Sequence, residues 1–232
     1  MLKSAYVGAA RQARGLARRA GLLDWLDARR DQRTALWARS LFAIHDIDAM
    51  VALDLPWWTF DAIDAADAFL AARPGARVFE YGSGASTIWL GRRAGHVVSV
   101  DHDAPWHDIV KRFAAAMPQI ALRMVPPDAV PDADPRYRSE KPGWRDRSFR
   151  AYVHSIDDEP GEFDMIVIDG RNRAACLEHS KDRLAPGGMI VFDNSSRSRY
   201  RAAIAGSGLR CAETRGLTAC LPYPDATTLL TN

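Results

Sequence analysis

The stretch Val78-Phe-Glu-Tyr-Gly-Ser-Gly-Ala-Ser-Thr87 decides the fold of this chain. An apolar run ends at an acidic residue, two glycines follow one residue apart, and a segment of helical composition begins. Gly82 and Gly84 lack a Cβ atom, so the backbone can turn tightly there and a ligand can approach the main chain. The first N–H groups of the new helix then point into the crevice beyond the strand. The stretch therefore predicts a strand that turns directly into a helix at a ligand-binding edge.

A second apolar run, His96-Val-Val-Ser-Val100, lies further along the chain and ends at Asp101. An acidic side chain at this position can accept hydrogen bonds from ribose hydroxyls. His102 follows directly and is expected near the adenine or the ribose. Together the two runs predict a nucleoside-containing cofactor across the carboxyl ends of two neighbouring parallel strands.

Strands and helices alternate along the rest of the chain, which indicates βαβ units and an α/β sandwich. We expect strands near residues 77–81, 97–101, 119–124, 163–169 and 188–193. We expect helices between them, near residues 85–94, 105–116, 148–157 and 172–184. Short runs near 208–213 and 225–231 are typical of a closing hairpin. The predicted fold class is a Rossmann-like, doubly wound, mostly parallel seven-stranded sheet.

Residues 1–55 are expected to form a basic helical extension before a main domain of residues 56–232. Basic side chains outnumber acidic ones there, and apolar residues at helical spacing form a thin, alanine-rich stripe. Gly21 is expected to separate two helices. The extension is expected to pack on the main domain or on a second subunit, which would make the protein a homo-oligomer. Contact with an anionic membrane surface is the alternative, which the weakly apolar stripe disfavours.

The composition argues against several classes of protein. The net charge of +2 is too small to indicate a nucleic-acid partner. The three cysteines are far apart and form no Cys-x-x-Cys pair, so neither a disulfide framework nor a cysteine-based zinc site is expected. Free thiols of this kind are typical of a reducing, cytoplasmic location. No segment approaches the roughly 20 apolar residues that span a bilayer.

Residues 126–147 interrupt the alternation with a polar segment that carries five prolines and interleaved basic and aromatic residues. A loop of this length inside a compact domain is usually either functional or disordered. A cover over the substrate and a plain mobile insertion are both open interpretations.

Three segments carry a resemblance to a known family. Glu80-Tyr-Gly-Ser-Gly84 resembles motif I of class I S-adenosylmethionine-dependent methyltransferases, in which an acidic residue precedes two glycines. Phe163-Asp-Met-Ile-Val-Ile-Asp-Gly170 resembles the fourth strand of that family. Leu184-Ala-Pro-Gly-Gly-Met-Ile-Val-Phe-Asp-Asn194 resembles its double-glycine turn and fifth strand. The resemblance covers roughly residues 56–232.

The resemblance implies roles for the residues around the first two strands. The glycine loop would carry the methionine part of S-adenosylmethionine, and Asp101 would hold the ribose. The residues expected to bind the cofactor are Glu80, Gly82, Ser83, Gly84, Asp101 and His102.

Asp169, Asp193 and Asn194 lie at the carboxyl ends of two expected parallel strands, so their side chains can converge beside the cofactor. Oxygen ligands of this kind suit Mg²⁺ or another hard divalent cation. The pattern is similar to the metal site of catechol-type O-methyltransferases, which implies an ion that binds the acceptor hydroxyl and lowers its pKa. In the alternative, Asp193 and Asn194 cap the next helix and Asp169 contacts substrate or backbone.

The residue that takes the acceptor proton is less defined. Catechol-type enzymes place a catalytic lysine three residues after the first metal-binding aspartate, and this chain has Asn172 there. The candidates are therefore Asp169, His154 and His179, although a histidine on a helix is more often structural than catalytic.

Arginines and tryptophans are expected around the acceptor. Arg171, Arg173 and Arg197 are suited to holding an anionic or polyhydroxylated molecule, with solvated or ion-paired surface arginines as the alternative. Trp57 and Trp58 are expected to cover the acceptor pocket, with packing between the extension and the main domain as the alternative.

These observations predict an S-adenosylmethionine-dependent methyltransferase that acts on a hydroxyl oxygen of a small molecule or a glycan. Two alternatives stay open. One is a nicotinamide-dependent oxidoreductase, which Thr87 disfavours because it replaces the third glycine of the dinucleotide fingerprint. The other is a non-catalytic module with the same cofactor fold that binds a partner through the basic N-terminal helices.

Overall fold

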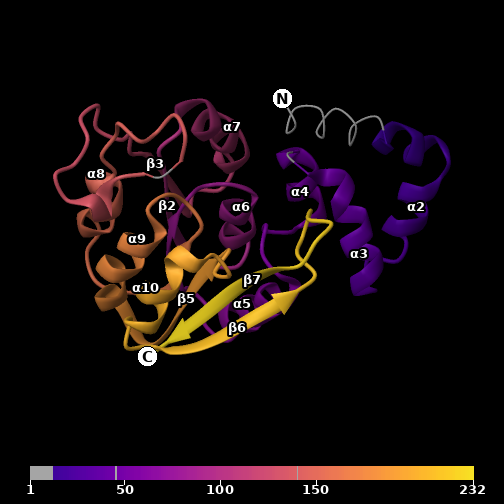
Figure 1. The fold of residues 1–232 in the computed structure, drawn as a ribbon. Coiled ribbons are helices and arrows are strands. Elements are labelled where there is room, and N and C mark those ends of the chain that lie inside the picture. The colour runs from indigo at the N-terminus through magenta and orange to yellow at the C-terminus, as the bar shows by residue number, and fades with distance from the viewer. Residues whose placement is uncertain (1–12, 45, 140) are drawn as a thin grey trace.

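The computed structural model describes residues 13–44, 46–139 and 141–232, and their seven strands form a single sheet (Figure 1). The strand order is β3-β2-β1-β4-β5-β7-β6. The first five strands run parallel, and β7 is antiparallel to both β5 and β6. The bounds are β1 (Arg77–Tyr81), β2 (His96–Asp101), β3 (Ile120–Met124), β4 (Phe163–Ile168), β5 (Leu184–Asp193), β6 (Arg210–Gly216) and β7 (Asp225–Thr231). The predicted fold class is confirmed.

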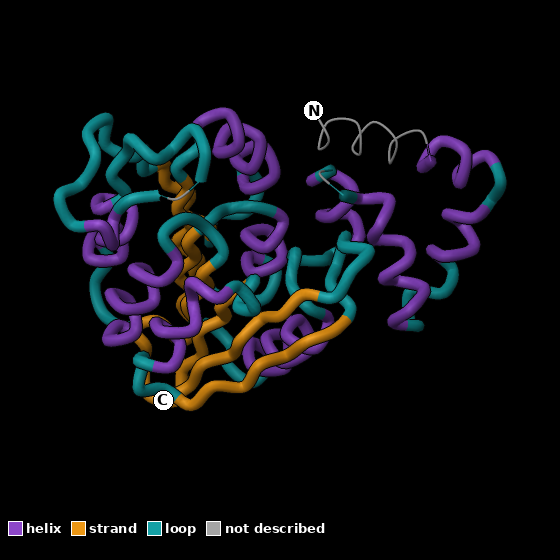
Figure 2. The backbone as a smooth tube through the Cα atoms, in the orientation of Figure 1, coloured by secondary structure: helices purple, strands orange, loops and turns teal. Residues whose placement is uncertain are grey.

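Helices cover both faces of the sheet (Figure 2). The bounds of the helices are α2 (Leu22–Asp27), α3 (Arg33–Ser40), α4 (Ile47–Leu53), α5 (Phe60–Ala71), α6 (Ala85–Gly91), α7 (Ala104–Ala114), α8 (Arg150–His154), α9 (Arg173–Ser180) and α10 (Arg201–Ala205), of which α2 and α3 lie apart from the sheet (Figure 1). Side chains of α4 to α7 belong to one apolar cluster, and side chains of α8 and α9 belong to a second. Neighbouring strand residues alternate between the clusters, since Val78 joins the first and Phe79 the second.

Several expected elements differ in their bounds, and the helix expected at residues 172–184 is split into α9 and the 3-10 helix η4 (Lys181–Arg183). The helix expected at residues 148–157 is split into α8 and the 3-10 helix η3 (Ser155–Asp158). The strand expected from residue 188 begins at Leu184, which pairs with Phe163 before an irregularity shifts the register. The start of β5 lies at an element end, where local pattern is the weakest signal.

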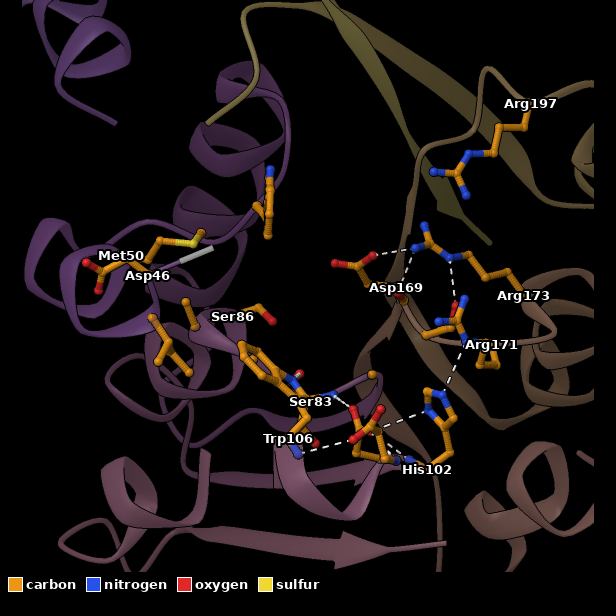
Figure 3. Close-up of a pocket in the computed structure, with 18 residues that line it drawn as sticks. Asp46, Met50, Ser83, Ser86, His102, Trp106, Asp169, Arg171, Arg173 and Arg197 are labelled. Atoms are coloured by element: carbon orange, nitrogen blue, oxygen red, sulfur yellow. Dashed lines mark hydrogen bonds and ion pairs between the residues drawn. The ribbon is translucent and has the colours of Figure 1, made fainter. Parts of the chain in front are cut away.

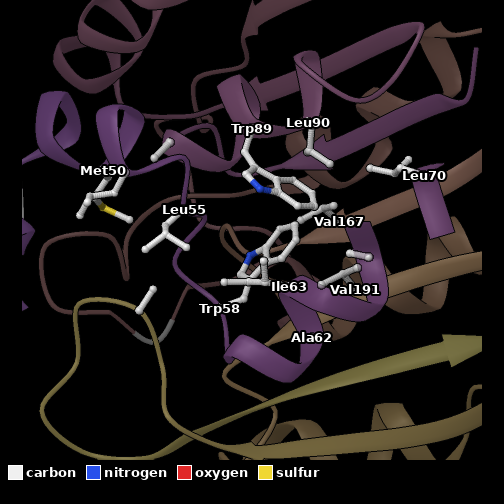
Figure 4. Close-up of a cluster of buried hydrophobic side chains, with 14 of the residues drawn as sticks. Met50, Leu55, Trp58, Ala62, Ile63, Leu70, Trp89, Leu90, Val167 and Val191 are labelled. Atoms are coloured by element: carbon white, nitrogen blue, oxygen red, sulfur yellow. The ribbon is translucent and has the colours of Figure 1, made fainter. Parts of the chain in front are cut away.

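The N-terminal segment has a glycine before α2 and a helix, α4, that packs into the main core. Gly21 adopts a left-handed φ of 71° immediately before α2, as its expected role between two helices requires. Most of the first expected helix lies outside the described residues, although residues 13–19 are helical. Helix α4 packs into the main core, where Met50 and Leu55 lie near the tryptophan pair of Trp58 and Trp89 (Figure 4). The structural unit around the sheet therefore includes residues that precede position 56.

The segment of residues 126–147 folds back onto the domain through local contacts. Tyr137, at the end of the 3-10 helix η2 (Pro135–Tyr137), is buried in the second apolar cluster. The Asp132 carboxylate accepts hydrogen bonds from Ser148 and Arg150. In the part of the chain that the structure describes, no helix has both the length and the apolar character needed to cross a bilayer.

Candidate functional site

A cavity of about 480 Å³ lies at the carboxyl ends of β1, β2 and β4 (Figure 3). Parallel strands of an open α/β sheet place ligand-binding crevices at this edge. Asp46 and Met50 lie across the cavity from Asp169, Arg173 and Arg197 (Figure 3). The N-terminal segment therefore forms one wall of the cavity. Sequence analysis missed this wall because its residues carry no motif of their own.

The two glycines of the loop after β1 serve different purposes. Gly82 has a left-handed φ of 101°, and a Cβ atom there would lie 2.6 Å from the backbone nitrogen of Gly170. Gly84 is extended, with φ −179°, and an added Cβ would meet only Ser86 and Trp106 at 3.8 and 3.9 Å. Gly82 is therefore required by the fold itself, whereas Gly84 leaves open space on the cavity side.

Glu80 lies behind the loop and is fully buried. Its carboxylate accepts hydrogen bonds from the hydroxyls of Ser86, Thr87 and Ser99 at 2.5, 2.5 and 2.6 Å. Burial raises the pKa of Glu80 to about 7. Glu80 does not line the cavity, so in this structure it joins the first turn of α6 to β2 instead of facing a ligand.

Asp101 lines the cavity and organises its floor. One carboxylate oxygen accepts the backbone N–H of Ser83 at 3.1 Å, and the other accepts those of His102 and Asp103 at 2.7 and 2.8 Å. Each oxygen of an ionised carboxylate can accept more than one hydrogen bond. Asp101 can therefore hold the glycine loop and still accept from a ligand hydroxyl.

Trp106 is a cavity residue that sequence analysis missed. Asp103 caps α7 by accepting the backbone N–H of Trp106 at 3.2 Å. The Trp106 indole N–H donates to the carbonyl of Ser83 at 2.7 Å, which fixes the ring against the glycine loop. A capping aspartate and a proline before an aromatic residue in the first helical turn were the available signals.

His102 connects the cavity to the segment of residues 126–147. Its Nε2 accepts a hydrogen bond from Arg171 Nε at 3.2 Å. Its ring packs edge-on against Trp144 of that segment, with centroids 4.9 Å apart, and against Phe149. The segment therefore reaches the rim of the cavity.

Arg173 lies between the two aspartates that were expected to hold a metal. Its Nη2 donates to the Asp169 carboxylate at 2.6 Å. Its Nη1 donates to the backbone carbonyl of Asp193 at 2.5 Å and lies 3.6 Å from the Asp193 carboxylate. Only 7% of Arg173 is exposed. The guanidinium thus pairs with Asp169 and also faces the carboxyl group of Asp193.

The two carboxyl groups influence each other. Burial and the neighbouring charge of Asp169 raise the pKa of Asp193 to about 8. Burial also raises the pKa of Asp169, although Arg173 and Arg197 oppose the shift. Asp193 is nearly inaccessible and accepts a hydrogen bond from Thr227, whereas the Asp169 side chain is 21% exposed at the cavity. Asp169 is therefore the member of the pair that a ligand can reach.

The arrangement does not fit a divalent cation held by Asp169, Asp193 and Asn194. The Asn194 side-chain amide donates to Asp225 at 2.9 Å, and Asn194 does not line the cavity. A divalent ion between the aspartates would be repelled by the buried Arg173 guanidinium, since like charges repel strongly at short range in a buried site. The expected metal triad is therefore not assembled in this structure.

The two tryptophans expected over the acceptor have different environments. Trp57 lines the cavity. Trp58 is completely buried and packs edge-on against Trp89, with ring centroids 5.7 Å apart (Figure 4). Trp58 is therefore a core residue and does not line the cavity.

A second cavity, of about 740 Å³, shares a wall with the first. Gly170, Arg171, Arg173 and Arg197 line both cavities. None of the described residues that line the second cavity is acidic, and its basic lining residues are Arg136, Arg138, Lys141, Arg171, Arg173, Arg197 and Arg199. The three arginines expected at the acceptor thus lie where the two cavities meet.

His154 and His179 lie away from both cavities. His154 ends α8, and His179 is in the last turn of α9, far along the helix from Arg173 at its start. Neither residue lines a cavity. This placement does not support a role for either histidine in taking the acceptor proton.

Comparisons with known proteins agree with this geometry. A family model described as a methyltransferase domain matches residues 79–195, which are 117 of the 232 residues. A comparison with curated protein sequences returns no match.

Solved structures share the fold at low sequence identity. An O-methyltransferase from Bacillus cereus in complex with SAH has a TM-score of 0.58 and 18% identity, over 83% of this chain and 90% of that one. The O-methyltransferase TomG from Streptomyces achromogenes, in complex with SAM, has a TM-score of 0.55 and 16% identity, over 84% and 88%. An rRNA methylase from Streptococcus thermophilus has a TM-score of 0.51 and 11% identity, over 73% and 95%. The chain therefore belongs to the methyltransferase-domain family and has the fold of class I S-adenosylmethionine-dependent methyltransferases.

Proposed function

We propose that the protein transfers a methyl group to a hydroxyl oxygen of an anionic small molecule or glycan. The observation that carries this proposal is the junction of the two cavities, one beside the glycine loop and one lined by basic side chains. Clustered arginines favour ligands that carry carboxylate or phosphate groups.

The first cavity has the features that S-adenosylmethionine requires. When bound, this cofactor supplies an electrophilic methyl group on its sulfonium. Gly84 leaves space beside the main chain, Asp101 can accept from ribose hydroxyls, and Trp106 forms an apolar wall. These contacts support placement of the cofactor against β1 and β2.

Asp169 is proposed to take the proton of the acceptor hydroxyl. It faces the cavity, and burial raises its pKa above the ordinary value, which makes its carboxylate a stronger base. Arg173 holds the carboxylate in place through its 2.6 Å hydrogen bond. Arg171 and Arg197, at the wall shared by the cavities, would orient the anionic part of the acceptor.

A small anionic acceptor is favoured over a nucleic acid by the shape of the basic region. The arginines line a bounded cavity, and the chain as a whole has a net charge of only +2. Binding to a nucleic-acid backbone is usually supported by an extended basic surface.

The cofactor assignment is tested by calorimetric titration with S-adenosylhomocysteine. Gly84→Val should fold normally, because its backbone is extended and its Cβ meets no atom closer than 3.8 Å. The added side chain should occupy ligand space and raise the dissociation constant by about a hundredfold, which is about 2.7 kcal/mol. Gly82→Val is the contrasting variant and should fail to fold. Undiminished binding by Gly84→Val would place the cofactor elsewhere.

The acceptor class is tested with matched hydroxyl compounds that differ only in an anionic group. Labelled methyl transfer from S-adenosylmethionine should favour the anionic member of each pair. Arg197→Ala should raise KM for the anionic compound and leave KM for the neutral compound unchanged. Equal preference in the parent protein would contradict an anionic acceptor and leave the cofactor assignment intact.

A further inference from the structure

We propose that His154, Asp157 and His179 form a binding site for Zn²⁺ on the surface of the domain, apart from the methyl-transfer site. The three residues come from α8, η3 and α9. They line neither of the two cavities, and the proposed function makes no use of them. Cysteine spacing excluded a thiolate zinc site, and this site contains no thiolate.

The ligand atoms are already close enough to share one ion. His154 Nδ1 lies 3.2 Å from Asp157 Oδ2, and His179 Nε2 lies 2.8 Å from the same oxygen. All three atoms lie within 4.8 Å of one another. Tetrahedral zinc, with bonds of about 2.0–2.2 Å, needs ligand atoms about 3.3 Å apart. The two contacts to Asp157 are within about half an ångström of that separation. Rotation of the two histidine rings toward each other would complete the site.

The ligand types favour zinc over a hard cation. Two imidazole nitrogens and one carboxylate oxygen form a donor set that suits Zn²⁺, whereas Mg²⁺ and Ca²⁺ prefer oxygen ligands throughout. The side chains of His154, Asp157 and His179 are 37%, 48% and 26% exposed, so the ion and a water ligand can reach the site from solvent.

The two histidine rings lie side by side next to one carboxylate. Their centroids are 4.0 Å apart, and the facing acidic group is the single carboxylate of Asp157. Part of that charge is also neutralised by Arg183, whose Nη1 lies 3.6 Å from the other oxygen, Oδ1. Arg183 faces Oδ1, whereas Oδ2 faces the two histidine rings and is the oxygen that a shared cation would bind.

A second-layer contact orients His154 for metal binding. The Tyr137 hydroxyl lies 3.1 Å from His154 Nε2. If Nε2–H donates to this hydroxyl, the lone pair of Nδ1 points toward Asp157. Zinc-bound histidines usually donate their other ring N–H in this way, and the contact holds the tautomer and the ring orientation.

The site would fasten the segment of residues 126–147 to the domain. Tyr137 belongs to that segment, and its neighbours Arg136 and Arg138 line the second cavity. An ion held by α8, η3 and α9 would therefore support, through Tyr137, the wall of the basic cavity. This role is structural, and the ion would not touch the acceptor.

The test uses the full-length protein, stripped with a chelator and titrated with Zn²⁺ by isothermal calorimetry. We expect one equivalent to bind with a micromolar or tighter dissociation constant. His179→Ala and Asp157→Asn should each weaken binding by at least about tenfold. His96→Ala and Asp182→Asn remove a histidine and a carboxylate outside the cluster and should bind like the parent.

A second measurement links the ion to the loop. Zn²⁺ should slow proteolysis within residues 126–147 of the parent but not of His179→Ala, and Tyr137→Phe should lose part of the protection. Circular dichroism checks that each variant is folded. No binding by the parent, or equal binding by His179→Ala, would overturn the proposal. Neither result would bear on the cofactor or the acceptor.

Discussion

Two clusters of charged side chains in this protein invite opposite conclusions about metal ions. In the first, Asp169 and Asp193 lie at the ends of two parallel strands, and Arg173 occupies the space between them. In the second, His154 and His179 approach the single carboxylate of Asp157 on the surface. The first cluster already contains its cation, whereas the second brings three possible ligand atoms within 4.8 Å of one another.

The difference shows that suitable ligand residues in a sequence do not define a metal site until their positions in the folded structure are known. Two aspartates and an asparagine after consecutive strands are a reasonable magnesium pattern. The helix that follows β4 nevertheless places an arginine side chain between them. The zinc candidate combines residues from separate segments, so their spacing in the sequence carried no signal. The predictions below test each side of this comparison.

The largest effect is expected from Arg173→Ala. Removing the guanidinium leaves two buried carboxyl groups without their cation, and loss of one partner from a buried ion pair costs about 3–5 kcal/mol. Urea unfolding measures the change in the free energy of unfolding. Arg173→Lys keeps the charge and should lose less, and added Mg²⁺ or Mn²⁺ should partly restore Arg173→Ala. An unchanged stability would show that the guanidinium does not compensate the aspartates.

Chelation should separate the two clusters in a single experiment. Excess EDTA should leave methyl transfer and binding of S-adenosylhomocysteine within about twofold of their untreated values, because Arg173 takes the place of a cation at Asp169. The same treatment should remove zinc from the surface cluster, as elemental analysis would detect. Loss of turnover that Mg²⁺ restores would instead support the catechol-type metal mechanism.

The two clusters should also give opposite dependences of stability on pH. The raised pKa of Asp193, about 8, means that the folded state keeps a proton that the unfolded state releases above its ordinary value of 3.8. Its contribution is therefore present at low pH and declines between about pH 4 and pH 8. For Asp157, burial raises the pKa, but hydrogen bonds from His179 and His154 outweigh it and lower the value below 3.8. Its contribution is present above pH 3.8 and is lost as the pH falls through that lowered value.

Urea unfolding from pH 3 to pH 8.5 measures these slopes. Asp193→Asn should remove a decline of up to about 1.4 kcal/mol per pH unit, the value for one proton. Asp157→Asn should change the free energy of unfolding only at acid pH. The change should be smaller than that for Asp193→Asn, because the Asp157 side chain is half exposed. Identical pH profiles for the two variants would contradict the difference between the clusters.

The smallest effect is expected from Asn194→Gly. Asn194 has a left-handed φ of 50°, which glycine adopts without strain. The substitution removes the hydrogen bond to Asp225 and should cost about 0.5–1.5 kcal/mol. Methyl transfer should be unchanged. A folded variant without activity would indicate that Asn194 is a metal ligand needed for methyl transfer.

Much of the fold could be predicted from local pattern. The apolar runs around Phe79 and Val98 are buried on both faces, as parallel strands require. Each run ends at an acidic residue, Glu80 in the first and Asp101 in the second. The closing antiparallel hairpin was also visible in the C-terminal runs. Element ends were less well defined, because the register shift in β5 depends on its partner Phe163.

The candidate site was only partly visible. Gly82, Gly84 and Asp101 could be recognised from the residues next to them. The two glycines mark a tight turn after a strand, and Asp101 stands at the end of a strand. Trp58 could not be distinguished from Trp57 by sequence, because adjacent residues differ only in which one the core covers.

By itself, the sequence determined the strand–glycine–helix unit, the alternation of strands and helices along the chain and the edge of the sheet at which a cofactor can bind. These features depend on periodicity and on backbone freedom, which act over a few residues. Only the tertiary structure decided that α4 closes the cavity, that Glu80 lies behind the loop, and that Arg173 lies between Asp169 and Asp193. Charge compensation and burial depend on distances between segments, and those distances exist only once the chain has packed.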